Sequence, residues 1–80
     1  MQKYLVVIEK GENSYGAYAP DVPGCIAVGE TVEEALKLIQ EALGFHLEGM
    51  AQDGEAIPAP AHVEAHFVEV EVPDKVTSTP

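Results

Sequence analysis

Arginine is absent from this 80-residue sequence, and four lysines carry its formal positive charge against fourteen aspartates and glutamates. A surface that binds nucleic acid through phosphate groups needs clustered lysine and arginine, so we expect no direct nucleic-acid binding. An anionic membrane would repel a chain with a formal net charge of −10 for the same reason. A strongly acidic small domain is suited to a basic protein partner, although the same charge would also serve solubility alone.

The sequence holds a single cysteine, Cys25, which excludes an internal disulfide framework and fits a reducing compartment. The apolar run that follows Met1 is too short to span a membrane, and no signal-peptide cleavage pattern is present. We therefore expect a cytoplasmic protein. Eighty residues form one small domain of marginal stability, which self-association commonly supplements.

The stretch A-P-D-V-P-G-C, residues 19–25, is a corner that stops regular secondary structure. Each proline fixes its own φ angle and removes a backbone donor, so neither a helix nor a central strand passes through it. Pro23 and Gly24 predict a tight turn, and the carboxylate of Asp21 is expected to accept hydrogen bonds from nearby backbone amides.

Four segments are rich in β-branched or aromatic residues, or are bounded by turn residues, which predicts strands. They are residues 3–10, 14–18, 25–28 and 62–72. In the first segment apolar residues occupy both faces, so we expect an inner strand that is covered on both sides. In the last segment the apolar residues change face near Phe67, which indicates a bulge or two halves that pack against different surfaces.

Residues 32–52 show the three-and-four spacing of apolar residues that is typical of an amphipathic helix. Thr31 is a good N-cap, and Glu34 three residues later completes a capping box. Glu30 and Glu33 also lie where the helix dipole favours negative charge. Gly54 predicts the end of the helix.

The order strand, strand, strand, helix, strand predicts a single α+β domain over residues 1–72, followed by a flexible tail over residues 73–80. The first three strands would form an antiparallel meander, and the helix would cross back to place the fourth strand parallel to the first. The expected fold is therefore β-β-β-α-β, a four-stranded mixed sheet of order 3-2-1-4 with the helix on one face. The other face stays open, which favours a homodimer or homotetramer.

The predicted oligomer interface combines the open sheet face with the edge of the helix stripe. Leu5 and Val7 point to the open face of the sheet. Leu38 and Phe45 lie on the shoulder of the apolar helix stripe, beyond the arc that a sheet would cover. A large exposed aromatic side chain beside a leucine usually marks a contact surface.

Three alternating side chains of the last predicted strand, His62, Glu64 and His66, would project from one face. This spacing could hold Zn²⁺ or another transition metal, which leaves a small metal-dependent hydrolase as an alternative. A half-exposed strand shows the same alternation without metal, and we predict no metal site.

No other pattern indicates catalysis. The carboxylates lack the paired spacing of a general acid and base, and glycine-rich phosphate loops are missing. Cys25 would be a nucleophile only beside a base that the sequence does not place. We therefore predict a protein that is not an enzyme and needs no cofactor.

Four ordered blocks of the sequence resemble the HicB antitoxin family. They are Y-G-A-Y-A-P-D-V-P-G-C, G-E-T-V-E-E-A, E-A-L-G-F-H-L-E and I-P-A-P, which begin at residues 15, 29, 41 and 57. The resemblance covers residues 1–72 and implies a partial ribonuclease-H-like fold. It also implies binding and silencing of HicA, a small basic toxin with a double-stranded-RNA-binding-like fold that cleaves messenger RNA. Many family members carry a C-terminal DNA-binding segment, and we expect a stand-alone member without one.

The combined expectation is an acidic, oligomeric antitoxin that neutralises a basic HicA-type toxin by protein–protein contact. Its partner-binding residues would join acidic charge near the corner and the helix start to aromatic and proline packing surface. They are Tyr15, Tyr18, Asp21, Pro23, Glu30, Glu33 and Glu34. An orphan oligomeric scaffold that has lost its partner is a further alternative.

Overall fold

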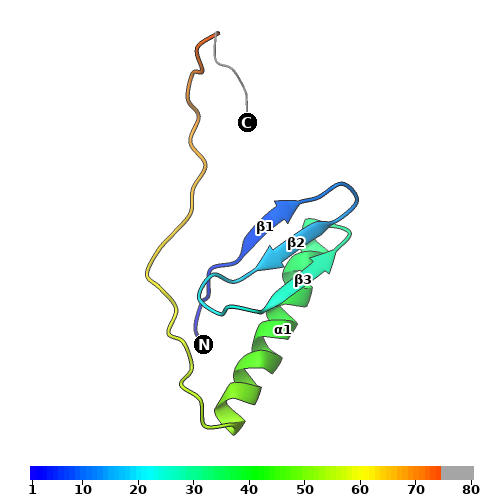
Figure 1. The fold of residues 1–80 in the computed structure, drawn as a ribbon. Helices are drawn as coiled ribbons and strands as arrows, with labels where there is room; N and C mark the ends of the chain where they lie inside the picture. Colours follow the sequence, from blue (N-terminus) through cyan, green and yellow to red (C-terminus); the bar gives the residue numbers. More distant parts are fainter. Residues whose placement is uncertain (75–80) are drawn as a thin grey trace.

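Three short strands and one long helix form the folded body of the protein in the computed structural model, which describes residues 1–74 (Figure 1). The elements are β1 (Val7–Lys10), β2 (Tyr15–Tyr18), β3 (Ile26–Gly29) and α1 (Val32–Gln52). The strands form an antiparallel sheet of order β1-β2-β3, and α1 packs mainly against β3 and β2. Of the predicted tail, Pro73 and Asp74 are exposed, and residues 75–80 lie outside the described residues.

The register of the sheet separates a covered face from an open face. Ala17 of β2 lies opposite Ala27 of β3, and Ala17 is buried in the core beneath the sheet. Tyr18 lies opposite Ile26 in the next row, and both side chains are exposed. Since successive side chains of a strand point to opposite faces, this second row belongs to the face that α1 leaves open.

Small side chains build most of the core between the sheet and α1. The buried apolar residues are Ala17, Ala19, Val22, Cys25, Ala35, Ile39 and Leu43. Gly29 marks the closest approach, because a Cβ atom there would lie 2.6 Å from the backbone nitrogen of Ala35. Only glycine lets the end of β3 lie this close to the first turn of α1.

Both ends of α1 follow the sequence prediction. Glu34 N donates to Thr31 Oγ1 at 3.0 Å, and Glu30 N donates to Glu34 Oε1 at 2.6 Å, which confirms the capping box. At the other end Gly54 has a φ of 75°, and its N–H donates to Ala51 O at 3.1 Å. A glycine in this left-handed conformation ends the helix.

The corner between β2 and β3 consists of two consecutive turns. Val22 N donates to Ala19 O at 3.0 Å, and Cys25 N donates to Val22 O at 3.2 Å. Gly24 has a φ of 87°, and together with Pro23 before it this is the pattern of a type II turn. Three of the core residues belong to this corner, so it anchors the sheet as well as reversing the chain.

The predicted fourth strand is wrong. Residues 53–74 contain neither helix nor strand, and the sheet has three strands. Residues 62–72 run away from the folded body without pairing to it (Figure 1). A β-branched composition predicts an extended backbone, but a strand also needs a neighbouring edge, which composition does not identify. The order 3-2-1-4, the parallel crossover and a ribonuclease-H-like topology therefore do not hold for the described residues.

The meander of the first three strands is confirmed, but β1 is an edge strand rather than the inner strand we expected. It is also shorter than residues 3–10, since its pairing with β2 ends at Val7 and Tyr18. Pro20 follows almost directly and has no amide N–H to donate, so the ladder stops before the corner. Residues 3–6 consequently precede the sheet without being part of it.

The close approach at Gly29 makes a stability prediction. In Gly29→Ala the added methyl group would meet the backbone of Ala35, which can move only if α1 moves. We expect the free energy of unfolding, measured by urea denaturation, to fall by about 1–3 kcal/mol.

Gly44→Ala is the matched control, because a Cβ at this exposed helical position has no neighbour within 4 Å. The higher helix propensity of alanine should raise the free energy of unfolding by about 0.5–1 kcal/mol. Equal effects of the two substitutions would contradict the proposed strand–helix contact.

Candidate functional site: two acidic surfaces at opposite ends of the sheet

The junction between β3 and α1 carries the first group of predicted partner-binding residues. Glu30, Glu33 and Glu34 are all exposed at the start of α1, where the helix dipole stabilises negative charge. Glu34 also accepts the Glu30 N–H, so it caps the helix as well as contributing charge. Tyr15 pairs with Gly29 across the sheet and lies half-buried against the core, next to this junction.

The corner carries the second group, Tyr18, Asp21 and Pro23. Tyr18 and Pro23 are exposed, whereas Asp21 is half-buried. The corner precedes β3 and the helix start follows it, so the two groups lie at opposite ends of a strand of four residues. At about 3.3 Å per residue this is a separation of roughly 13 Å. The residues that the sequence predicted to form one partner-binding surface therefore lie on two separate surfaces.

Two hydrogen bonds tie the segment after α1 to the folded body. Asp21 Oδ2 accepts from Ala61 N at 2.9 Å, and the Tyr4 hydroxyl donates to Pro58 O at 2.6 Å. We expected Asp21 to bond amides nearby in the chain, but its partner lies forty residues further on. Tyr4 was not singled out, and the only sequence signal for its contact is the I-P-A-P linker, whose extended backbone exposes its carbonyl groups.

The predicted oligomer-interface residues also fall on more than one surface. Val7 opens a row with Tyr18 and Ile26 on the uncovered face of the sheet, and Leu5 is half-buried just before β1. Leu38 is half-buried on α1.

Phe45 is 80% exposed. Together with Pro23, His46 and other residues it lines an open cavity of about 510 Å³. Phe45 therefore lies on the same surface as Pro23 of the corner, away from the open face of the sheet.

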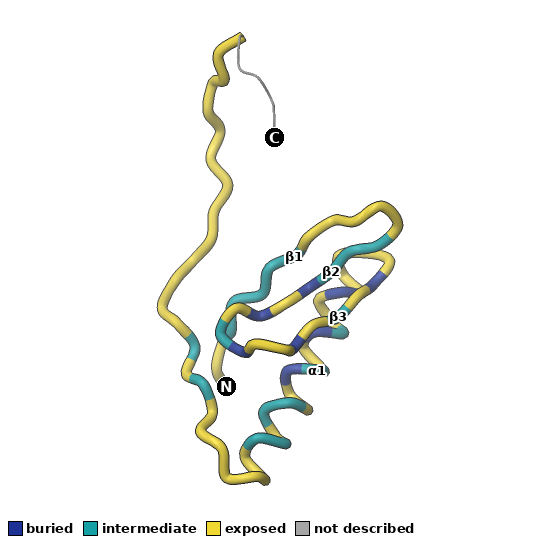
Figure 2. Tube along the Cα trace, viewed as in Figure 1, coloured by how far each residue is buried: buried dark blue, intermediate teal, exposed yellow. Residues whose placement is uncertain are grey.

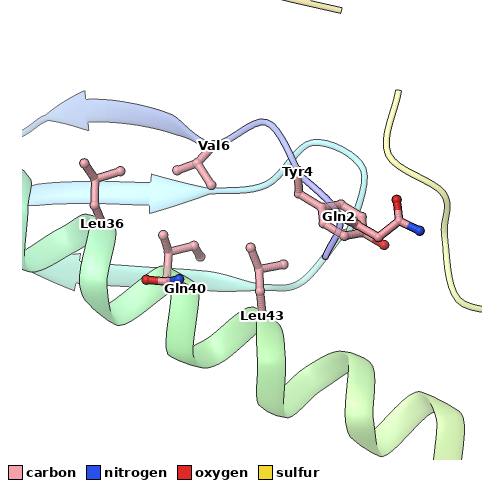
Figure 3. Close-up of a pocket in the computed structure, with 7 residues that line it drawn as sticks. Gln2, Tyr4, Val6, Leu36, Gln40 and Leu43 are labelled. Carbon is pink, nitrogen blue, oxygen red and sulfur yellow. The ribbon is translucent and has the colours of Figure 1, made fainter. Parts of the chain in front are cut away.

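A mainly apolar cavity of about 320 Å³, which Gln2 and Gln40 also line, lies between α1 and the chain that leads into β1 (Figure 3). Tyr4 and Val6 border it on the strand side, and Leu36 and Leu43 on the helix side. The cavity lies on this side because α1 packs mainly against β3 and β2 and covers β1 less completely. Its described lining contains no carboxylate, histidine or cysteine, so it offers no acid–base or metal chemistry.

The alternating histidines do not assemble into a three-ligand cluster. His66 Nε2 and Glu64 Oε1 lie 2.8 Å apart on the surface, and His62 does not join them. Within residues 1–74, no group of three or more histidine, cysteine, aspartate or glutamate side chains is arranged to hold a metal ion. Cys25 is buried, and burial raises the pKa of its thiol, which disfavours the nucleophilic thiolate.

No helix in the described part of the chain is long and apolar enough to cross a membrane.

A family model described as the HicB-like antitoxin of bacterial toxin–antitoxin systems matches residues 4–79. The chain belongs to the HicB-like antitoxin family. This confirms the resemblance carried by the four sequence blocks that begin at residues 15, 29, 41 and 57.

Individual relatives of this family member agree. A 14.9 kDa protein from the rep-hol intergenic region of Haemophilus phage HP1 is 37% identical over 94% of this chain and 56% of its own length. Antitoxin HicB of Escherichia coli K12 is 34% identical over 84% of this chain and 49% of its own. UPF0150 protein Ta0767 of Thermoplasma acidophilum is 40% identical over 70% of this chain and 83% of its own. The chain thus spans about half the length of the HicB antitoxin and of the phage protein.

The bond between Asp21 and Ala61 makes a testable prediction. Asp21→Ala should release residue 61 from the corner and speed amide hydrogen exchange at Ala61 about fivefold, which corresponds to a hydrogen bond of ~1 kcal/mol. The matched control is Asp53→Ala, which removes the same charge at the C-cap of α1, where the cap bonds are made by the backbone N–H. Unchanged exchange at Ala61 in Asp21→Ala would contradict the tether.

Proposed function

We propose that this chain is an antitoxin that binds and neutralises a small basic toxin of the HicA type by protein–protein contact in the cytoplasm. The observation that carries the proposal is the match of the HicB-like antitoxin family to residues 4–79. Relatives that bear the name Antitoxin HicB, in Photorhabdus laumondii and in Escherichia coli, support it.

The charge of the molecule is suited to such a partner. The formal net charge is −10, and no lysine of residues 1–74 forms an ion pair with a carboxylate in that range. Lysine therefore does not neutralise the carboxylates of this part of the chain in close pairs. A field of one sign accelerates the encounter with a partner of opposite charge and disfavours acidic competitors.

The start of α1 is the best candidate for the central contact. Glu30 lies just before the N-cap of α1 and Glu33 lies in the first turn of the helix. The capping box fixes the backbone here, so little backbone order has to be gained on binding. Tyr15 adds aromatic surface beside them. Tyr18 and Pro23 would form a second contact at the corner, where Asp21 contributes by positioning the linker.

Self-association is the second part of the proposal. The uncovered sheet face presents Val7, Tyr18, Ile26 and Val28, with Leu5 just outside the sheet. An apolar row of this kind is commonly covered by another copy of the chain. A homodimer or homotetramer would bury it, and Leu38 and Phe45 could add a contact along α1.

Binding of the basic protein encoded beside this chain tests the antitoxin role. In the double variant Glu30→Gln and Glu33→Gln we expect the dissociation constant, measured by calorimetric titration, to rise about tenfold, or ~1.4 kcal/mol. The loss should be larger at low salt, because screening weakens charge pairs.

The matched control is the double variant Glu41→Gln and Glu48→Gln, which removes the same charge from exposed positions further along α1. It should bind nearly as tightly as the native chain. Absence of a complex with the native chain at low salt would overturn the antitoxin role, and equal losses in both double variants would move the contact away from the helix start.

A further inference from the structure

Residues 62–72 are the largest feature of the molecule that the proposed function leaves unused. We call this segment the arm. It is exposed along its whole length (Figure 2), although it carries Val63, Phe67, Val68, Val70 and Val72. The ring of Phe67 has no cover at all. So many exposed large apolar side chains on one segment of a small protein mark a surface that another element covers.

The outer edge of β1 has no strand paired to it, so it offers a place where an extended segment such as the arm could pair. β1 pairs only with β2, so its outer backbone N–H and C=O groups have no ladder partner in the sheet. An exposed edge without proline is a ready template for another strand. The apolar cavity beneath this edge, between Val6 and Leu36, is also uncovered. The sheet therefore has room for one more strand beside β1.

The arm of the same chain does not occupy this place. Open cavities of about 540 and 370 Å³ separate residues 61–66 from Lys3 and its neighbours. The origin of the arm is fixed by the bonds of Pro58 to Tyr4 and of Ala61 to Asp21. Because the proline-rich linker is stiff and extended, it directs the arm past its own β1 rather than onto it (Figure 1).

We propose that the arm of one copy adds as a strand to the β1 edge of a second copy, and that the second copy returns its own arm to the first. Each chain carries both a free strand and a free edge, so a two-fold exchange satisfies both and needs no third component. This edge contact differs from the face contact proposed above, and it does not depend on a toxin.

The length and pattern of the arm support exchange. Eleven extended residues span roughly 36 Å, whereas the four residues of β1 span roughly 13 Å, so the arm is longer than one edge requires. Its apolar side chains also change face partway. Val63 and Phe67 share one face, and Val68 and Val70 share the other. A strand that leaves one domain and enters another meets apolar surface on different sides.

The charges of the β1 edge and of the arm favour pairing between two copies of this chain over pairing with an unrelated protein. Lys3 and Lys10, two of the four lysines, bracket the chain that forms the β1 edge. The arm contains Glu64, Glu69 and Glu71 and no lysine. Opposite charges on neighbouring strands favour pairing. Residues 3–10 also contain Glu9, so this edge carries two lysines against one glutamate and attracts a basic toxin less than the acidic helix start does.

The molar mass of the full-length chain in solution, measured by light scattering over a wide concentration range, tests the exchange. The native chain should form dimers. Val68→Pro removes a backbone donor from the arm and should raise the dimer dissociation constant about a hundredfold. Because residue 68 is exposed and outside every element of the body, the helical circular dichroism signal should not change.

Val68→Thr is the matched control, because threonine keeps both the amide N–H and the β-branched shape, and this variant should dimerise like the native chain. A native chain that stays monomeric would overturn the proposal. So would a Val68→Pro variant that dimerises as tightly as the native chain, since pairing of the arm would then not hold the dimer together.

Mixed samples of isotope-labelled and unlabelled chain identify which copy the arm contacts. We expect nuclear Overhauser contacts between residues 62–72 of one copy and β1 of the other. Contacts that occur only within one chain would overturn the exchange in favour of a sheet closed by its own arm. An arm that gains contacts only when the toxin is added would overturn it in favour of a docking segment for the partner.

Discussion

The contact between Gly29 and Ala35 decides how the helix lies on the sheet. Because no side chain separates the end of β3 from the first turn of α1, the helix is drawn toward β3, and Ala17 lets it extend under β2. The helix consequently covers β1 less than β2 and β3, although Ile8 of β1 still packs against the core. The open cavity beside Val6 results from this off-centre packing, whereas the edge of β1 is free because β1 is the last strand of the sheet.

The acidic start of α1 combines stability with the proposed binding role. Glu34 fixes the first turn through the Glu30 amide, and the helix dipole lowers the electrostatic cost of placing Glu33 beside it. A basic partner would meet a helix start whose backbone is already ordered. The same arrangement explains why Glu34 is less suited than its neighbours to a binding test, since changing it would also loosen the helix.

Local signals in the sequence were sufficient for the helix and the corner. Thr31, Glu34 and Gly54 mark the helix ends through bonds within a few residues, and Pro23 with Gly24 requires its turn. The arm could not be placed in this way, because its alternation predicts an extended backbone but not its neighbour. The sequence did allow the separation of Asp21 from Glu33 to be predicted, because the corner precedes β3 and the helix follows it. The tether from Asp21 to Ala61 joins residues too far apart in the chain for any local pattern to predict.

In a single chain β1, β2, β3 and α1 form the stable unit, and in the proposed exchange the arm becomes ordered only with a second copy. Amide hydrogen exchange of the full-length chain at low and high protein concentration tests it most directly. The account predicts that Ala17, Ala35 and Ile39 are protected at both concentrations, whereas residues 62–72 become protected only at the high one. Protection of the arm that does not depend on concentration would contradict the account, because the arm would then be folded within its own chain.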